Sequence, residues 1–297
     1  GCIEQTTSSV FPQLYLSQIK VLTEIEQKNT QRNITAAIER LKSFIQRDGG
    51  FVYWPGAENS DPWGTTYAGH FLLEAQANGY YVPDDMLKRW KKYQKNKALE
   101  WRRNDQYYSS ELMQAYRLYT LALAGVPEIG AMNRLREQGN VGTTAMWMLA
   151  SSYIKAGQPE AAKKLIEKLP TTVKPYRELS YSYGSDFRDK ALILETLVLL
   201  NDKTKAFALL KEISKALSDN GYWMSTQETA FCLKAVASFV SLDKKGELKY
   251  AYTLNGKKIN ASTQLPIAQI QIPIAGVKKE SLQITNESTG MLFTRLI

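Results

Sequence analysis

Residues 1–8 are Gly-Cys-Ile-Glu-Gln-Thr-Thr-Ser, and they place a cysteine and a glutamine three positions apart, at Cys2 and Gln5. Side chains three positions apart lie on one face of a helix, so these two can meet within a single turn. A cysteine thiol that displaces ammonia from a glutamine amide forms an internal thioester, an acyl group that amines attack directly. The same residues also suit a buried cysteine followed by polar helix-start residues, because short motifs match by chance. The stretch therefore predicts either a thioester or a structural cysteine.

The residues around the Cys-Gln pair favour the thioester. With Gly1 before it and Thr-Thr-Ser after it, the stretch resembles the thioester region of bacterial α2-macroglobulins. Further segments resemble the thioester domain of that family in the same order along the chain, namely residues 63–75, 146–150, 183–195 and 223–230. The resemblance covers most of residues 1–245. It implies that Cys2 and Gln5 form the thioester and that Ile3 and Glu4 shape the turn between them.

The resemblance also implies a function. It implies a protease inhibitor of the trapping kind, in which cleavage of a bait region outside this chain exposes the thioester to the attacking protease. A lysine amine of that protease would then take the acyl group of Gln5. Each thioester reacts once, so we expect no enzyme. Target proteases and other domains of the same parent chain are the expected partners, and a bacterial periplasm or cell envelope, with a membrane-anchored parent, is the expected location.

The chain begins at the motif itself, so we expect it to be a piece of a larger protein. A thioester survives only where water is excluded, and the segments that would cover it lie outside the chain. We therefore expect no intact thioester in the isolated piece. In its place we expect a reduced, reactive Cys2 at a mobile N-terminus.

Helical patterns recur along the first 245 residues. They begin near Trp63, Tyr107, Thr143, Arg188 and Thr226, a spacing of about 35 to 45 residues that is typical of a two-helix repeat. The first helix of each unit is apolar nearly all round, and the second carries a charged face, as in residues 88–97 and 205–217. A helix that is apolar on all sides must be surrounded by other elements. The pattern predicts a mainly α fold, an (α/α)6 toroid with alternating inner and outer helices.

The toroid prediction is specific about its two ends. Residues 6–47 supply an additional hairpin, which ends at Asp48-Gly49-Gly50, and about six hairpins favour a closed ring over an open solenoid. Closure would bring Cys2 near residues 223–229. The inner ring is expected to hold Phe71, Trp147, Leu194 and Phe231.

The pattern changes from helical to alternating near residue 246. Residues 249–254 alternate, and Asn255-Gly256 is typical of a type I′ hairpin turn. Further strands are predicted at residues 267–273, 282–284 and 291–293. We therefore predict a toroid domain over residues 1–245 and a small antiparallel β unit over residues 246–297. By the resemblance, the β unit is part of a CUB-like sandwich.

Six aromatic residues lie next to the inner helices and are candidates to shield a thioester from water. They are Tyr53, Trp54, Trp63, Tyr67, Tyr181 and Tyr183. Exclusion of water matters because water competes with every target amine. Ordinary aromatic packing explains the same residues equally well.

His70 and four acidic residues are the other candidates for chemistry. His70 lies inside an apolar helix, which favours a core histidine over an acyl relay, so amines rather than hydroxyls are the expected nucleophiles. Toroids also host glycoside hydrolases, which need two carboxylates in a cleft, and the inner helices carry Asp186, Asp189, Glu195 and Glu228. Ion pairing explains these acids better. A helical scaffold without chemistry is the remaining alternative.

Composition excludes several other classes of function. The formal net charge is +9, but the basic residues accompany no nucleic-acid-binding motif, so no nucleic-acid partner is expected. The chain has two cysteines and one histidine, too few for a zinc cluster or a His-rich site, and no cofactor or metal is expected.

Cys232 lies in an apolar stretch and suits a buried position; a Cys2–Cys232 disulfide would consume the thiol that the thioester needs. No apolar run is long enough to span a membrane.

Overall fold

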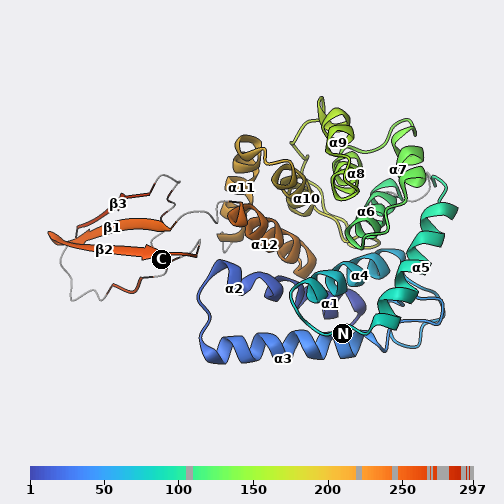
Figure 1. The fold of residues 1–297 in the computed structure, drawn as a ribbon, viewed down its shortest axis with the longest axis horizontal. Coiled ribbons are helices and arrows are strands. Elements are labelled where there is room, and N and C mark those ends of the chain that lie inside the picture. Colours follow the sequence, from blue (N-terminus) through green and yellow to red (C-terminus); the bar gives the residue numbers. More distant parts are fainter. Residues whose placement is uncertain are drawn as a thin grey trace.

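The computed structural model describes residues 1–104, 110–218, 223–242, 247–265, 268, 270–272, 281–288, 292 and 294. Inner segments of a ring alternate along the chain with outer helices (Figure 1). The inner segments are α1 (Ile3–Ser8), η1 (Phe11–Tyr15), α2 (Leu16–Ile19), α4 (Pro62–Ala77), α6 (Ser110–Leu123), α8 (Thr143–Lys155), α10 (Asp186–Leu199) and α12 (Thr226–Ser241). The outer helices are α3 (Glu24–Leu41), α5 (Asp84–Glu100), α7 (Ile129–Arg136), α9 (Pro159–Ile166) and α11 (Lys203–Ser218).

The ring is closed. Each inner helix packs against the next, from α4 through α6, α8 and α10 to α12, and α12 packs against α1, η1 and α2. This contact joins the two ends of the helical region and confirms the mainly α toroid. In the described residues α12 is followed by strands, and α11, the last outer helix among them, packs against both α10 and α12.

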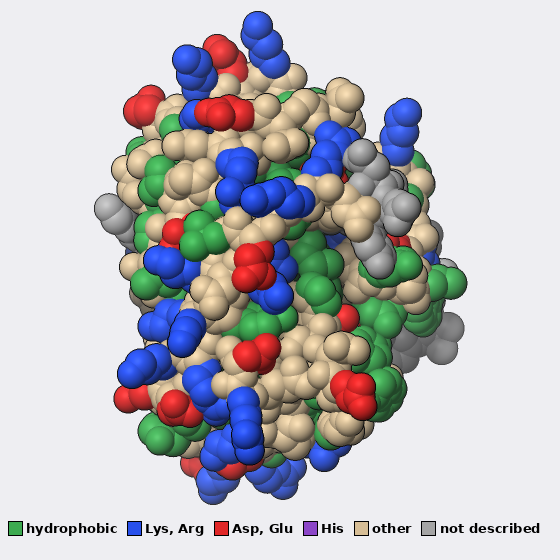
Figure 2. All heavy atoms as spheres, turned by 90° about the vertical axis from the view of Figure 1, so that its right-hand side faces the viewer, with side chains coloured by type: hydrophobic (Ala, Val, Ile, Leu, Met, Phe, Trp, Pro, Cys, Tyr) green, Lys and Arg blue, Asp and Glu red, His purple; other side chains and the backbone are tan. Residues whose placement is uncertain are grey.

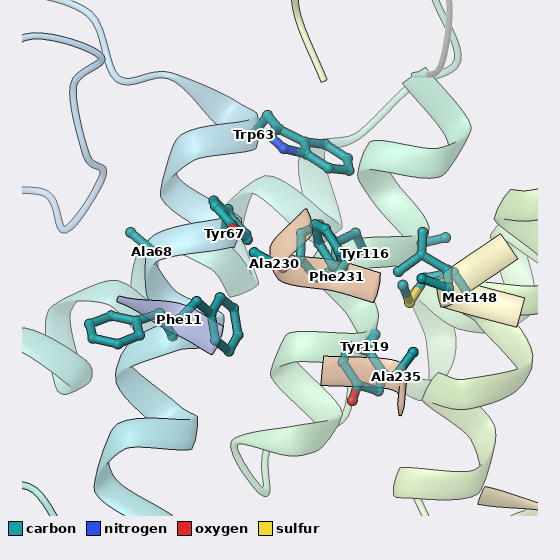
Figure 3. Close-up of a cluster of buried hydrophobic side chains, with 14 of the residues drawn as sticks. Phe11, Trp63, Tyr67, Ala68, Tyr116, Tyr119, Met148, Ala230, Phe231 and Ala235 are labelled. Carbon is teal, nitrogen blue, oxygen red and sulfur yellow. The ribbon is translucent and has the colours of Figure 1, made fainter. Parts of the chain in front are cut away.

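The centre of the ring is a continuous aromatic and aliphatic core, in which Tyr67, Tyr116 and Phe231 converge from α4, α6 and α12 (Figure 3). The Tyr67 and Phe231 rings stack with centroids 5.4 Å apart. The four residues predicted for the inner ring are at most 2% exposed: Phe71, Trp147, Leu194 and Phe231. Nearly every side of α4 is buried, which is why its sequence lacks a polar face.

The outer helices carry the charge. Lys and Arg side chains are spread over the side of the molecule that bears α5 and α7, with Asp and Glu between them (Figure 2). Several of the α5 cations are paired with acids: Arg89 with Asp85, Lys95 with Glu128, and Lys97 with Glu100. The charged stretch at residues 88–97 is thus a solvated outer face, as predicted for the second helix of its unit.

The N-terminal hairpin, predicted over residues 6–47, is less regular than two continuous helices. Residues 6–22 do not form one helix: α1 ends at Ser8, and a separate turn follows in which Pro12, which lacks an amide hydrogen, stands near the start of η1. The outer helix begins at Glu24, where Thr23 and Glu26 form a capping box, so Ile25 is 73% exposed and has no core role.

The β unit is a three-stranded antiparallel sheet with the order β2-β1-β3, built from β1 (Leu248–Leu254), β2 (Lys257–Thr263) and β3 (Leu282–Asn286). Leu254 pairs with Lys257 across a two-residue turn whose φ angles are 49° at Asn255 and 86° at Gly256. These angles confirm the type I′ hairpin. The predicted domain boundary at 245/246 lies outside the described residues. Of the strands expected at 267–273 and 291–293, residues 268, 270–272 and 292 are described and do not lie in a strand, and the other positions are outside the described ranges.

Candidate functional site

Cys2 and Gln5 face each other across the first turn of α1. Cys2 is the N-cap, in an extended conformation, and its Sγ accepts a hydrogen bond from the Gln5 backbone N–H over 3.4 Å. In return, the Cys2 backbone N–H donates to Oε1 of Gln5 over 3.3 Å. A capping box of this kind normally has Ser or Thr at the cap and Glu or Gln three residues later. Here a thiol takes the place of the hydroxyl, so the cap itself brings a nucleophile to a side-chain carbonyl.

The two side chains differ in their exposure. Cys2 is 2% exposed, whereas Gln5 is exposed to solvent. The Ile3 backbone N–H donates to the Tyr53 carbonyl over 3.1 Å and ties this end of the chain to the loop before α4. The thiol is buried in a capped and anchored turn, which contradicts the expectation of a mobile N-terminus. The reactivity of Cys2 stays a prediction. A nucleophile reaches this pair from the Gln5 side.

Tyr53, Trp54 and Tyr183 form an aromatic cluster on the sulfur side. The Tyr53 and Tyr183 hydroxyls are 2.8 Å apart, their rings stack at 6.2 Å, and the Trp54 ring meets Tyr53 edge-on at 5.7 Å. Burial, together with hydrogen bonding to the Cys2 thiol and the Tyr183 hydroxyl, raises the pKa of Tyr53. Tyr53 is therefore a protonated hydrogen-bonding group beside the Cys2 sulfur at neutral pH. These three candidates lie together beside Cys2, and their role as a shield stays a prediction.

The other three shielding candidates, Trp63, Tyr67 and Tyr181, do not belong to this cluster. The Trp63 ring packs under the Arg188 guanidinium at 4.9 Å. The Tyr67 hydroxyl shares a hydrogen bond with Ser8 in the ring core over 3.1 Å. Tyr181 is 58% exposed on a turn. Ordinary packing, the alternative drawn from sequence, accounts for Trp63 and Tyr67.

A buried arginine holds the loop that carries Tyr183. Arg188 is fully buried and donates to Asp189 over 2.8 Å, to the Ser182 carbonyl over 3.1 Å and to the Tyr176 hydroxyl over 3.1 Å. Asp189 also accepts from Tyr176 and from Thr144 of the neighbouring inner helix. Sequence reasoning missed this network, although both charged residues lie in a segment that resembles the α2-macroglobulins. Its effect is to fix the position of Tyr183 relative to Tyr53.

The four acidic candidates for glycoside hydrolysis are all engaged by neighbours. Lys234 pairs with Glu195, Lys190 lies 3.4 Å from Asp186, and Arg188 pairs with Asp189. Glu228 accepts from the Ser225 backbone N–H over 3.2 Å and lies 3.8 Å from Arg177. A hollow of about 650 Å³ is lined by Asp189 and Glu111, and Glu111 also has an arginine partner, Arg103, at 3.1 Å. Ion pairing, the interpretation favoured from sequence, is confirmed.

His70 and Cys232 are core residues. Nδ1 of His70 is 2.8 Å from the Tyr116 hydroxyl, and its ring contacts Phe11 edge-on at 5.0 Å. Burial lowers the pKa of His70, so its imidazole is neutral at physiological pH. Cys232 is a fully buried free cysteine whose pKa is raised by burial, and Cys2 is also free, so no disulfide joins them.

The described part of the chain contains neither a metal-binding cluster nor a membrane-spanning helix. Within it, no group of three or more His, Cys, Asp or Glu side chains is arranged to hold a metal ion. Among the helices described, none combines the length and apolar character needed to cross a bilayer.

Comparisons with known proteins identify the relatives. No protein-family model matches the chain. It is 25% identical to the alpha-2-macroglobulin of Escherichia coli K12 over 98% of its own length, and it spans only 19% of that relative. Salmonella alpha-2-macroglobulin reacted with methylamine shares the fold with a TM-score of 0.71 and 24% identity, over 96% of this chain and 18% of that one. Escherichia coli alpha-2-macroglobulin activated by porcine elastase shares the fold with a TM-score of 0.67 and 22% identity, over 96% of this chain and 25% of that one.

Proposed function

We propose, from the likeness of this chain to bacterial alpha-2-macroglobulins, that Cys2 and Gln5 form an internal thioester and that the chain is the thioester domain of a protease inhibitor. The observation that carries the proposal is the reciprocal pair of hydrogen bonds between Cys2 and Gln5 in the first turn of α1. After cleavage of a bait region elsewhere in the parent protein, a lysine amine of the attacking protease would become bound to Gln5. The proposed setting is a bacterial periplasm or cell envelope.

Formation of the thioester follows from the geometry of the cap. The Cys2 sulfur attacks Cδ of Gln5; the C–S bond forms, the C–N bond breaks, and the amide nitrogen leaves as ammonia with the thiol proton. Negative charge develops on Oε1 during this step. The Cys2 backbone N–H already points at Oε1 and would stabilise that charge as an oxyanion-hole donor does.

Aminolysis runs in the opposite sense at the same carbon. A neutral amine attacks Cδ of Gln5; a C–N bond forms, the C–S bond breaks, and the sulfur leaves as the Cys2 thiol with a proton from the amine. Because burial and its two polar neighbours raise the pKa of Tyr53, its hydroxyl is protonated and can donate a hydrogen bond to the departing sulfur. Each thioester is consumed once, so the reaction is stoichiometric and not enzymatic.

Both this chain and other domains of the parent protein would protect the thioester from water. The aromatic cluster of Tyr53, Trp54 and Tyr183 covers the buried sulfur, whereas the Gln5 side faces solvent. Other domains of the parent protein would cover Gln5 until activation. The Escherichia coli structure activated by elastase supports proteases as the partners.

Methylamine tests the proposal. Incubated with the full-length protein, it is expected to add one amine at Gln5 and to release one titratable thiol at Cys2, as measured by peptide mass and thiol titration. Cys2→Ala and Gln5→Ala should each abolish both signals, while Cys232→Ala, at the buried core cysteine, should retain them. Incorporation that survives in Cys2→Ala would exclude the thioester. Glycan hydrolysis that depends on Glu195 or Asp186 would support the hydrolase alternative instead.

A further inference from the structure

A solvent-open hollow of about 560 Å³ lies directly beside Gln5. One wall is the segment from Gly1 to Gln13, and the other is the α3 face that carries Asn33, Ala37 and Arg40. Gln5 itself lines the hollow, whereas the Cys2 thiol is buried on the opposite side, under Tyr53. Among the spaces described around the Cys2–Gln5 pair, this one gives a nucleophile access to the acyl carbon.

Most polar side chains that line the hollow are neutral, and two of them are held by hydrogen bonds. Asn33 donates to Gln13 over 3.2 Å, and Gln13 donates to the Ser9 carbonyl over 2.8 Å. These bonds fasten α3 to the turn after α1, so the two walls are held at a fixed separation. Ala36 and Ala37 add small apolar side chains, which leave the space open.

Arg40 is the only charged side chain among the described residues that line the hollow. Its guanidinium packs over the Phe44 ring at 5.6 Å, and the structure gives it no carboxylate partner within the described ranges. Glu39, the neighbour of Arg40 in sequence, pairs with Lys42 at 2.6 Å, and Glu4 of α1 accepts hydrogen bonds from Ser8 and Thr226. The hollow therefore presents one uncompensated positive charge beside the reactive glutamine.

We propose that this hollow is the site that receives the incoming amine, and that Arg40 makes it select amines with a carboxylate close by, such as a lysine flanked by an acidic side chain. The proposal rests on the proposed function and adds a substrate preference to it. The described lining residues include no carboxylate to hold an ammonium ion, and only the neutral amine has the lone pair that attacks Cδ of Gln5. A second positive charge on the same molecule is repelled by Arg40, while a carboxylate is attracted.

The expected size of the effect is modest because Arg40 is exposed. A solvent-exposed ion pair changes a rate by about two- to fivefold. Attraction speeds the reaction of an anionic amine and repulsion slows that of a cationic amine. The ratio of the two rates is therefore larger than either effect alone. The preference should weaken as salt is added, since the screening length falls to about 3 Å at 1 M ionic strength.

Three amines of matched length test the proposal on the full-length protein: pentylamine, 5-aminopentanoate and 1,5-diaminopentane. Rates are measured by thiol release at Cys2 and mass gain at Gln5, per neutral amino group present. We expect 5-aminopentanoate to react several-fold faster than 1,5-diaminopentane at low salt, with pentylamine between them. Arg40→Gln should bring the ratio close to one, Arg40→Glu should invert it, and Arg40→Lys should keep it. Arg32→Gln, at an exposed arginine of α3 outside the hollow, is the matched control and should keep the ratio.

The outcomes separate the two proposals. If the amines react but Arg40→Gln and Arg40→Glu leave the ratio at the wild-type value, the acceptor role of the hollow is wrong while the thioester stands. If Arg32→Gln lowers the ratio as much as Arg40→Gln does, the preference comes from overall charge and the role of Arg40 is again wrong. If none of the three amines is incorporated, the proposed function fails, and the inference with it.

Discussion

The Thr226 hydroxyl donates a hydrogen bond to the Glu4 carboxylate over 3.0 Å, although 222 residues separate the two in sequence. The same carboxylate oxygen accepts from Ser8 over 2.9 Å, and Ser8 shares a hydrogen bond with Tyr67. The turn that carries Cys2 and Gln5 is thereby fastened to the first and the last long inner helices of the ring. The position of the reactive pair depends on closure of the ring.

Glu4→Ala should therefore destabilise the ring closure. The substitution removes the acceptor for two side-chain hydrogen bonds, and bonds to a charged group contribute about 1.5–3 kcal/mol each at most. We expect the free energy of unfolding to fall by about 1–3 kcal/mol in chemical denaturation. Glu58→Ala, at an exposed acid in a loop, is the control and should stay within about 0.5 kcal/mol of wild type. Equal effects of the two substitutions would contradict the closure role of Glu4.

Arg188→Met should loosen the cover over Cys2. Without the guanidinium, the buried Asp189 loses its ion-pair partner, which costs about 3–5 kcal/mol, and the loop bearing Tyr183 loses its anchor. We expect lower stability and, once methylamine has released the Cys2 thiol, faster alkylation of Cys2 under native conditions, with Cys232 quantified separately by peptide mass. Arg136→Met, at a partly exposed arginine, is the control. A Cys2 alkylation rate equal to that of wild type would show that the network does not position Tyr183.

Gly64 should be intolerant of a side chain. A Cβ at this position would lie 2.7 Å from Cγ2 of Ile3 and 2.7 Å from Oδ1 of Asp61, the N-cap of α4. Gly64→Ala is therefore expected to push α1 away from α4, lowering the melting temperature and the methylamine incorporation together. Gly130→Ala is the matched control, because a Cβ there meets nothing within 4 Å. It should stabilise α7 by about 0.5–1 kcal/mol, and a similar gain in Gly64→Ala would refute the close approach.

Glu74 should make the ring sensitive to acid. Burial alone would raise the pKa of Glu74, but Lys234 and His70 outweigh burial and lower it to about 2. The carboxylate faces Lys234 of α12 at 3.9 Å and His70 of its own helix at 3.5 Å, with Glu195 and Tyr15 close to the same lysine. A carboxyl group whose pKa is depressed by folding stabilises the protein above its unfolded pKa. That contribution is lost as the pH falls from about 4.5 towards 2.

The pH dependence of unfolding measures this contribution. For a shift of this size it amounts to about 3 kcal/mol at most, and Glu74→Gln should remove that part of the acid-induced loss of stability. Urea unfolding at pH 6, 4.5 and 3 compares the variant with wild type. Glu160→Gln, at an exposed acid that pairs with Lys163, should retain the wild-type slope. A Glu74→Gln slope identical to wild type below pH 4.5 would contradict the assignment.

The sequence alone determined the elements whose causes are local. The spacing of apolar residues distinguishes α4 and α10, which are buried on nearly every side, from the outer helices, which bury one face. A helix that is buried on all sides has no room for a polar face. Asn255 and Gly256 specify their hairpin turn because both accept positive φ angles. Cys2 and Gln5 meet because residues three apart share a turn. Each of these relationships involves residues that are close in sequence, so it can be predicted from the sequence directly.

Only the tertiary structure decided what surrounds the Cys2–Gln5 pair. Tyr53 and Tyr183 are 130 residues apart yet share a hydrogen bond. Arg188 donates a hydrogen bond to the loop that carries Tyr183, and Arg40 of α3 lines the same hollow as Gln5. Burial of Cys2 beneath this cluster likewise overturned the expectation of a mobile terminus. Contacts of this kind depend on the closure of a ring of helices, which sets distances between segments that no local pattern in the sequence encodes.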